Sequence, residues 1–204
     1  WYPEKAAVPL GYGPLEPLAE INLVGNQAGT SPTENSYVLT DVSPTDLIVV
    51  TMPAGLPFTA WSPWAADDST KPTPPPVIGY TWTTSFNVTS SSGTATYNGG
   101  TFYSTATAAW VAGQANMPIY LTGSPYYTFW LTDPNPPDNR GGLSLRLYRQ
   151  KSLIGINLAH VLYDSLTAKD MDGEPVETIN DASFRAAADR FYLEGFGIGT
   201  AYDA

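Results

Sequence analysis

The stretch LSLRLY, residues 143–148, places leucine at every second position, with Ser, Arg and Tyr in between. This period of two is typical of a β-strand that has one face in a core and the other in solvent. Similar short runs, separated by Pro, Gly, Asn and Asp, extend outward over residues 36–149. The expected strands are Ser36–Thr40, Asp46–Met52, Tyr80–Val88, Thr94–Tyr97, Met117–Leu121, Tyr126–Leu131 and Leu143–Tyr148. Their number and spacing predict a mainly β protein built on a jelly-roll-like antiparallel β-sandwich.

Two segments inside this region do not fit the strand pattern. The alanine-rich stretch Thr101–Gln114 is either a short helix or a crossover of small residues. The loop Trp61–Val77 contains five prolines among acidic and hydroxyl residues. Because proline cannot donate to a β-ladder, we expect this loop to be an extended excursion on the surface.

After Lys151 the pattern changes to two helices, expected over Asn157–Ala168 and Asp181–Glu194. Asn and Asp at their starts are good N-caps, and Gly195 stands where a left-handed C-terminus is favoured. The apolar stripes predicted for the two helices are Leu158, Val161, Leu162 and Leu166 in the first, and Phe184, Ala187, Ala188 and Phe191 in the second. The helices are expected to form an α+β unit separate from the sandwich.

Composition excludes several classes of function. Only 14% of the residues are charged, the formal net charge is −10, and the basic residues are scattered, so nucleic acid is not an expected partner. Cysteine is absent, which excludes disulfides, thiolate nucleophiles and zinc–thiolate sites. No apolar run is long enough to span a bilayer.

Nothing in the sequence points to an enzyme. His160 is the only histidine, and Asp164 follows it at helical spacing, which allows a base and its orienting acid; a packing role is favoured because catalysis needs converging groups. Asp67 and Asp68 are candidates for the paired carboxyls of glycoside cleavage, but adjacent acids on a polar loop are more simply solvated charges.

The segment from Ile156 reads INLAHVLYDSLTAKDMDGEPVETINDASFRAAADRFYLEGFGIGTAYD. Its order of helix, Gly-containing loop, acidic helix and EGFG turn resembles the tail tip attachment (host-specificity) proteins of long-tailed phages, although Leu158 stands where that family usually has proline. The resemblance implies a structural hub protein at the distal end of the virion tail. It also implies that the partners are other tail subunits, with the chain itself forming a homotrimer.

The opening WYPEKAAV, residues 1–8, resembles a phrase that stands shortly before the first helix in the same family. Here about 145 residues separate the two, which favours a domain inserted into a hub loop. The chain then divides into a hub segment 1–8, a linker and entry 9–35, the inserted sandwich 36–150 and a second hub segment 151–204. Insertion predicts that Val8 and Ser152 lie near one another.

The corner LTDPNPPDNRGG, residues 131–142, places four oxygen-bearing side chains within seven residues. Hard cations such as Ca²⁺ take six to eight oxygen ligands, whereas the alternative is ordinary Asx turn chemistry. The corner and the final strand also resemble calcium-dependent galactose-binding lectins of bacteria. The candidate ligands for Ca²⁺ are Asp133, Asn135, Asp138 and Asn139.

Such lectins bind sugars through paired hydroxyls on the metal and an aromatic ring on the apolar face of the sugar. The candidate sugar contacts are Trp61, Trp64, Tyr126 and Arg140, although core packing is the alternative for most aromatic residues. The first functional hypothesis is therefore a tail hub whose insert binds a host surface carbohydrate. The others are an insert that braces the virion without binding and, ranked last, a polysaccharide depolymerase.

Overall fold

The structure, a computed structural model, describes residues 7–63, 81–134, 136–168, 173, 175, 179–195 and 197–198. The chain divides into two compact units. Residues 15–150 form one unit, and residues 1–14 together with 151–204 form the other. Trp64, Asn135 and the pair Asp67 and Asp68 lie outside the described residues.

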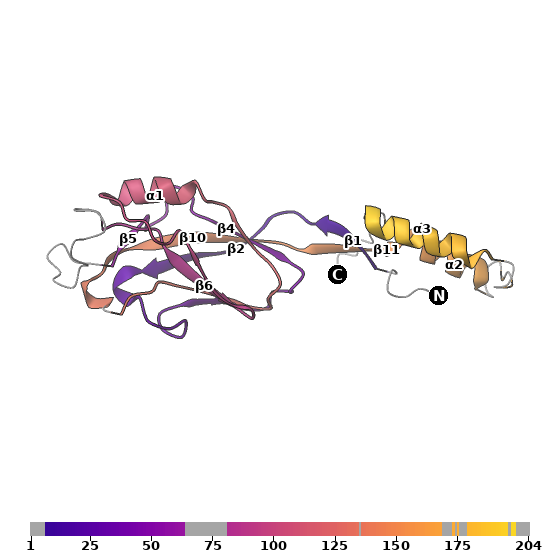
Figure 1. Cartoon of the computed structure of the whole chain (residues 1–204), viewed down its shortest axis with the longest axis horizontal. Helices are drawn as coiled ribbons and strands as arrows, with labels where there is room; N and C mark the ends of the chain where they lie inside the picture. Colours follow the sequence, from indigo (N-terminus) through magenta and orange to yellow (C-terminus); the bar gives the residue numbers. More distant parts are fainter. Residues whose placement is uncertain are drawn as a thin grey trace. The chain divides into compact units, whose positions relative to one another are not determined.

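The unit of residues 15–150 is an antiparallel β-sandwich, as predicted, with eight main strands (Figure 1). They are β2 (Glu16–Val24), β3 (Tyr37–Leu39), β4 (Leu47–Thr51), β6 (Phe86–Ser90), β7 (Gly93–Tyr97), β8 (Ile119–Leu121), β9 (Tyr127–Trp130) and β10 (Arg140–Gln150). One sheet has the order β2-β10-β4-β8 and the other β3-β9-β6-β7. Counted along the chain, the first sheet holds the first, eighth, third and sixth strands, which is the jelly-roll order.

The core lies between the two sheets and follows from the alternation in the strands. Leu143, Leu145 and Leu147 of β10 are fully buried, and β9 contributes Tyr127 and Phe129 from the other sheet. β10 is the long central strand, because it pairs with both β2 and β4. A short strand, β5 (Trp61–Ser62), pairs with the start of β10.

The first strand of the sandwich lies where a linker was expected. Residues 9–35 were predicted as linker and entry, but β2 pairs with β10 along nearly its whole length. Its alternation is broken by Pro17 and by a register shift opposite the Leu147–Tyr148 step, which hides the period of two. Ile21 and Leu23 nevertheless belong to the core.

The alanine-rich stretch is a helix, α1 (Ala106–Gln114). The Thr105 side chain caps it by accepting a hydrogen bond from the Ala108 amide at 3.1 Å. At its other end, Gln114 Nε2 donates to the Met52 carbonyl at 2.7 Å and so ties the helix to the end of β4. The expected strand Tyr80–Val88 is regular only from Phe86, and its earlier described residues form isolated bridges.

The other unit contains a small sheet in the order β1-β11-β12 and two helices. Its elements are β1 (Ala7–Tyr12), β11 (Ser152–Asn157), α2 (Leu158–Thr167), α3 (Asp181–Glu194) and β12 (Gly197–Ile198). β1 is antiparallel to β11, with Val8 opposite Gly155 and Tyr12 opposite Ser152. The chain therefore enters and leaves the jelly roll through two paired strands, the arrangement that an inserted domain requires.

Both helices have the predicted ends, but α2 buries a different face. Asn157 caps α2 by accepting from the Ala159 amide at 3.1 Å, and Gly195 ends α3 at φ 66°. The residues of α2 that are buried are Ala159 and His160, whereas Leu162 is 48% exposed. The stripe predicted for α2 is therefore wrong at Leu162, because α2 packs against α3 through the face that carries Ala159 and His160. Among the described residues, no helix is long and apolar enough to cross a membrane.

Candidate functional site

The candidate calcium loop, residues 133–139, connects β9 to β10 and is held at both ends by the same segment of chain. It contains a short 3-10 turn, η3 (Pro136–Asp138), which packs against another, η2 (Gly25–Gln27). The Asp133 amide donates to the Gly29 carbonyl at 3.0 Å, and Asn139 Nδ2 donates to the Gly25 carbonyl at 2.9 Å. The loop is therefore anchored to residues 25–29, about a hundred positions earlier in the chain.

Asn139 provides the observation that tests whether a cation fits this loop. Its side chain is 7% exposed, and its amide nitrogen is already committed to Gly25. Its Oδ1 atom is buried and accepts no hydrogen bond from any residue that the structure describes. Leaving a buried carbonyl oxygen without a donor costs about 1–3 kcal/mol, so a cation ligated by this oxygen would remove that cost.

Two carboxylates accompany this oxygen on the same loop. Asp133 is 6% exposed and Asp138 is half-buried. Within the described ranges, no group of three or more His, Cys, Asp or Glu side chains is placed to hold a metal. A cation at this loop would therefore take amide and backbone carbonyl oxygens beside the two carboxylates, which Ca²⁺ accepts.

Arg140, a predicted sugar contact, lies at the exposed rim of the loop beside an aromatic residue that sequence reasoning missed. Its guanidinium is 5.3 Å from the centroid of the Trp82 ring, and its Nη2 donates to Thr81 Oγ1 at 3.3 Å. Trp82 is half-buried. Gly141 lets the ring approach, because a Cβ at that residue would lie 2.9 Å from Trp82. The only sequence signal for Trp82 was its place in the expected strand, which favours a packing role.

Trp61 does not lie on an exposed loop, so that expectation is wrong. It is 3% exposed, and its Nε1 donates to the Ser85 carbonyl at 2.8 Å. Its backbone exchanges two hydrogen bonds with Thr83, at 3.0 and 2.9 Å. The proline-rich stretch thus begins after Trp61, and β5 holds this residue against the core.

Tyr126 is exposed, as a sugar contact would be, but it lies at the other end of β9 from the candidate loop. Asp133 stands seven positions further along the chain, which corresponds to about 23 Å in a fully extended chain at a rise of about 3.3 Å per residue. The two residues cannot contact the same sugar unit. The sequence-predicted set is therefore divided, and Trp82 takes the position beside the loop that was expected for Trp61.

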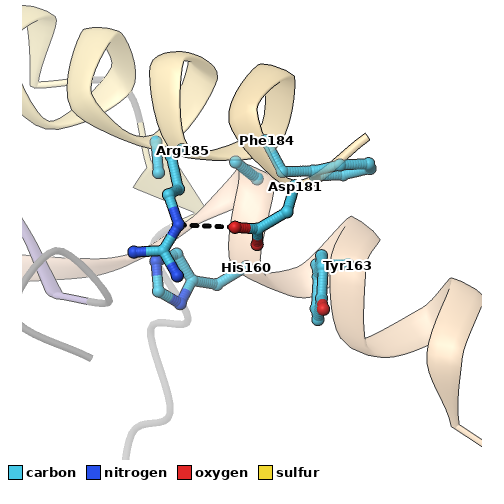
Figure 2. A pocket seen from close by; sticks show the side chains of 7 residues that line it. His160, Tyr163, Asp181, Phe184 and Arg185 are labelled. Atoms are coloured by element: carbon cyan, nitrogen blue, oxygen red, sulfur yellow. Dashed lines mark hydrogen bonds and ion pairs between the residues drawn. The ribbon is translucent and has the colours of Figure 1, made fainter. Parts of the chain in front are cut away.

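His160 lies between the two helices of the other unit, where it packs as expected. Figure 2 shows it beneath Arg185 and Asp181 of α3, whose side chains form an ion pair at 2.7 Å. The hydrogen bond from Arg185 lowers the pKa of Asp181. Tyr163 meets Phe184 edge to face at 5.4 Å between ring centroids. The cavity at this place has a volume of about 20 Å³, enough for one water molecule, which is too small for a substrate.

Comparisons of the chain with protein-family models, with curated proteins and with solved structures find no match. The two resemblances, to tail tip attachment proteins and to bacterial lectins, therefore stay predictions from the residues that carry them. The jelly roll between paired strands and the loop anchored by Asn139 are the structural features that bear on function.

Proposed function

We propose that the chain is part of a phage tail tip hub and that its inserted jelly roll binds a host surface carbohydrate during adsorption. The observation that carries the proposal is the insertion itself. Residues 15–150 have their own core and are connected to the rest of the chain only through the paired strands β1 and β11. Domains inserted in this way keep their structure while they present loops to a ligand.

The unit that carries β1 and β11 exposes apolar surface, which supports its assembly with other subunits. Among its described residues, the buried hydrophobic side chains are Ala159 and Ala188. In contrast, Ile156 is 49% exposed, Leu162 48% and Leu193 80%. Large apolar side chains left in solvent favour association, and a homotrimer at the distal end of the tail would cover them.

Replacing Leu193 with aspartate is expected to weaken self-association of the full chain at least tenfold. Burying a leucine at an interface contributes about 1.5–3 kcal/mol, and every 1.4 kcal/mol changes Kd tenfold. Val111→Asp is the matched control, because Val111 is 57% exposed on α1 of the jelly roll. Sedimentation equilibrium measures both variants. A wild-type chain that stays monomeric at high concentration would rule out the hub assembly.

The loop anchored by Asn139 supports calcium-dependent binding. Asp133, Asp138 and Asn139 would hold the ion, and bound Ca²⁺ would supply coordination positions for two sugar hydroxyls. Arg140 and Trp82 lie next to the loop and would contact the sugar from one side. Their role is to orient the ligand, because the guanidinium donates hydrogen bonds and the indole offers an apolar face.

A glycan array probed with the full chain, once with Ca²⁺ and once with EDTA, tests the binding proposal. The Ca²⁺ concentration is about 1 mM, because weak extracellular calcium sites have Kd values of about 10⁻⁴–10⁻³ M. The proposal predicts that a family of related glycans is retained more strongly with Ca²⁺ than with EDTA. Retention of no glycan under either condition would overturn the proposal and leave the insert as a brace.

A further inference from the structure

The two outer faces of the jelly roll differ in their chemistry. On the sheet β2-β10-β4-β8, Arg146 pairs with Glu20 at 2.9 Å and Arg149 with Glu16 at 3.1 Å. On the other sheet, none of the strands β3, β9, β6 and β7 contains Asp, Glu, Lys or Arg. An uncharged outer face is unusual in a chain with 19 acidic and 9 basic residues, because solvated sheet faces usually carry charges.

The side chains on this uncharged face follow from the alternation of its strands. Phe86 and Val88 of β6 and Phe129 of β9 belong to the core, so their neighbours in the sequence face outward. Asn87 lies opposite both Trp130 and Thr96, which places an amide, an indole and a hydroxyl side by side across three strands.

A hollow with a volume of about 490 Å³ opens on this face at the end nearest the candidate loop. It lies within the size range of small-ligand sites, about 300–1,000 Å³. Its lining is entirely uncharged and consists of Pro32, Trp61, Ser85, Phe86, Asn87, Thr94, Thr96, Trp130 and Thr132. Asn87 and Trp130 face outward and form the buried floor, to which parts of the core residues Trp61 and Phe86 are added, while Thr94, Thr96 and Thr132 are exposed at the rim.

Hydrogen bonds hold the polar floor in place and leave capacity for a ligand. Thr96 Oγ1 donates to Asn87 Oδ1 at 2.7 Å, and Asn87 Nδ2 donates to Thr132 Oγ1. Trp130 Nε1 donates to Thr89 Oγ1 at 3.1 Å. Because the Thr132 hydroxyl accepts from Asn87, its own hydrogen is available to a ligand, and Thr96 can still accept.

We infer that this hollow is a second carbohydrate subsite, which binds an uncharged sugar unit directly and without a metal. The inference rests on the proposed function and adds the class of sugar. A fixed set of hydroxyl and amide groups over aromatic rings fits the hydroxyls and the apolar C–H face of a neutral saccharide. Anionic sugars are disfavoured, since the described residues that line the hollow include no cation and the chain carries a net charge of −10.

The test is isothermal titration calorimetry of the full chain in EDTA with lactose, maltose and N,N′-diacetylchitobiose as neutral probes, and 3′-sialyllactose as the anionic probe. We expect at least one neutral disaccharide to bind and 3′-sialyllactose to bind at least tenfold more weakly. The double variant Thr96→Val/Thr132→Val should lower affinity for that neutral probe about tenfold, because it removes both hydroxyl groups that remain able to bond a sugar.

Thr128→Val is the matched control, because Thr128 faces outward from the same sheet but does not line the hollow. It should leave the affinity within about twofold, and thermal unfolding should show that all variants are folded. Binding in Ca²⁺ that is lost in EDTA and unaffected by the threonine variant would overturn this inference and leave the calcium-dependent function standing. Preference for 3′-sialyllactose would overturn it too. No binding in either Ca²⁺ or EDTA would overturn both.

Discussion

Phe129→Ala is expected to lower the free energy of unfolding of the jelly roll by about 3–5 kcal/mol, the usual cost of removing a large buried aromatic side chain. Phe129 is fully buried, and its strand β9 lies between β3 and β6 in the middle of its sheet. The cavity cannot collapse easily, because neighbours on both strands are fixed by ladder hydrogen bonds. Calorimetry of the full chain should show the melting temperature of the sandwich falling by about 10–20 °C.

Val38→Ala is the control for this loss of packing. Val38 is on the adjacent strand β3 but faces outward and is 51% exposed. Surface substitutions of this kind usually change stability by about 0.5 kcal/mol or less. Equal losses in the two variants would mean that the sheets do not enclose the core described for Phe129.

Asp133→Asn is expected to remove most of the stabilisation that Ca²⁺ gives to the protein. An ion present at a hundred times its Kd stabilises the folded state by about 2.7 kcal/mol. Removing one carboxylate charge while keeping the side-chain volume should raise that Kd about a hundredfold, and the stabilisation then falls to about 0.4 kcal/mol. Thermal unfolding with Ca²⁺ and with EDTA measures the difference for each protein.

Asp41→Asn controls for the loss of one negative charge. Asp41 is exposed, and its φ of 59° is one that asparagine also adopts readily, so the fold should not change. This variant should keep the full response to Ca²⁺. The calcium assignment fails if the wild type shows no response, or if Asp133→Asn responds as strongly as Asp41→Asn.

The sandwich could be predicted from the sequence because most of its strands bury one face only. Leu143, Leu145 and Leu147 alternate with polar residues, and this pattern is enough to find β10 and its side of the core. β2 was hidden, because a register shift interrupts its alternation and its partner β10 lies more than a hundred residues away. Pairing over such distances is not visible in a local pattern.

The candidate loop could be found from its residue types, but its setting could not. The sequence shows that Asp133, Asp138 and Asn139 stand close together in one loop. It does not show that Asn139 donates to Gly25, because that hydrogen bond joins two distant segments of the chain. Trp61 was expected as a sugar contact and Trp82 as a packed strand residue, but Trp61 lies in the core and Trp82 lies beside Arg140. Contacts between distant segments again decide these positions. β5 pairs with β10 and takes Trp61 into the core, and the turn at Gly141 leaves room for Trp82.

We propose that residues 15–150 are an inserted jelly roll that folds by itself and carries the candidate calcium loop. Differential scanning calorimetry of these residues expressed alone, with Ca²⁺ and with EDTA, tests this proposal. We expect one cooperative transition, because the core lies wholly within these residues, and a higher melting temperature with Ca²⁺. A fragment without a cooperative transition in either condition would contradict the proposal.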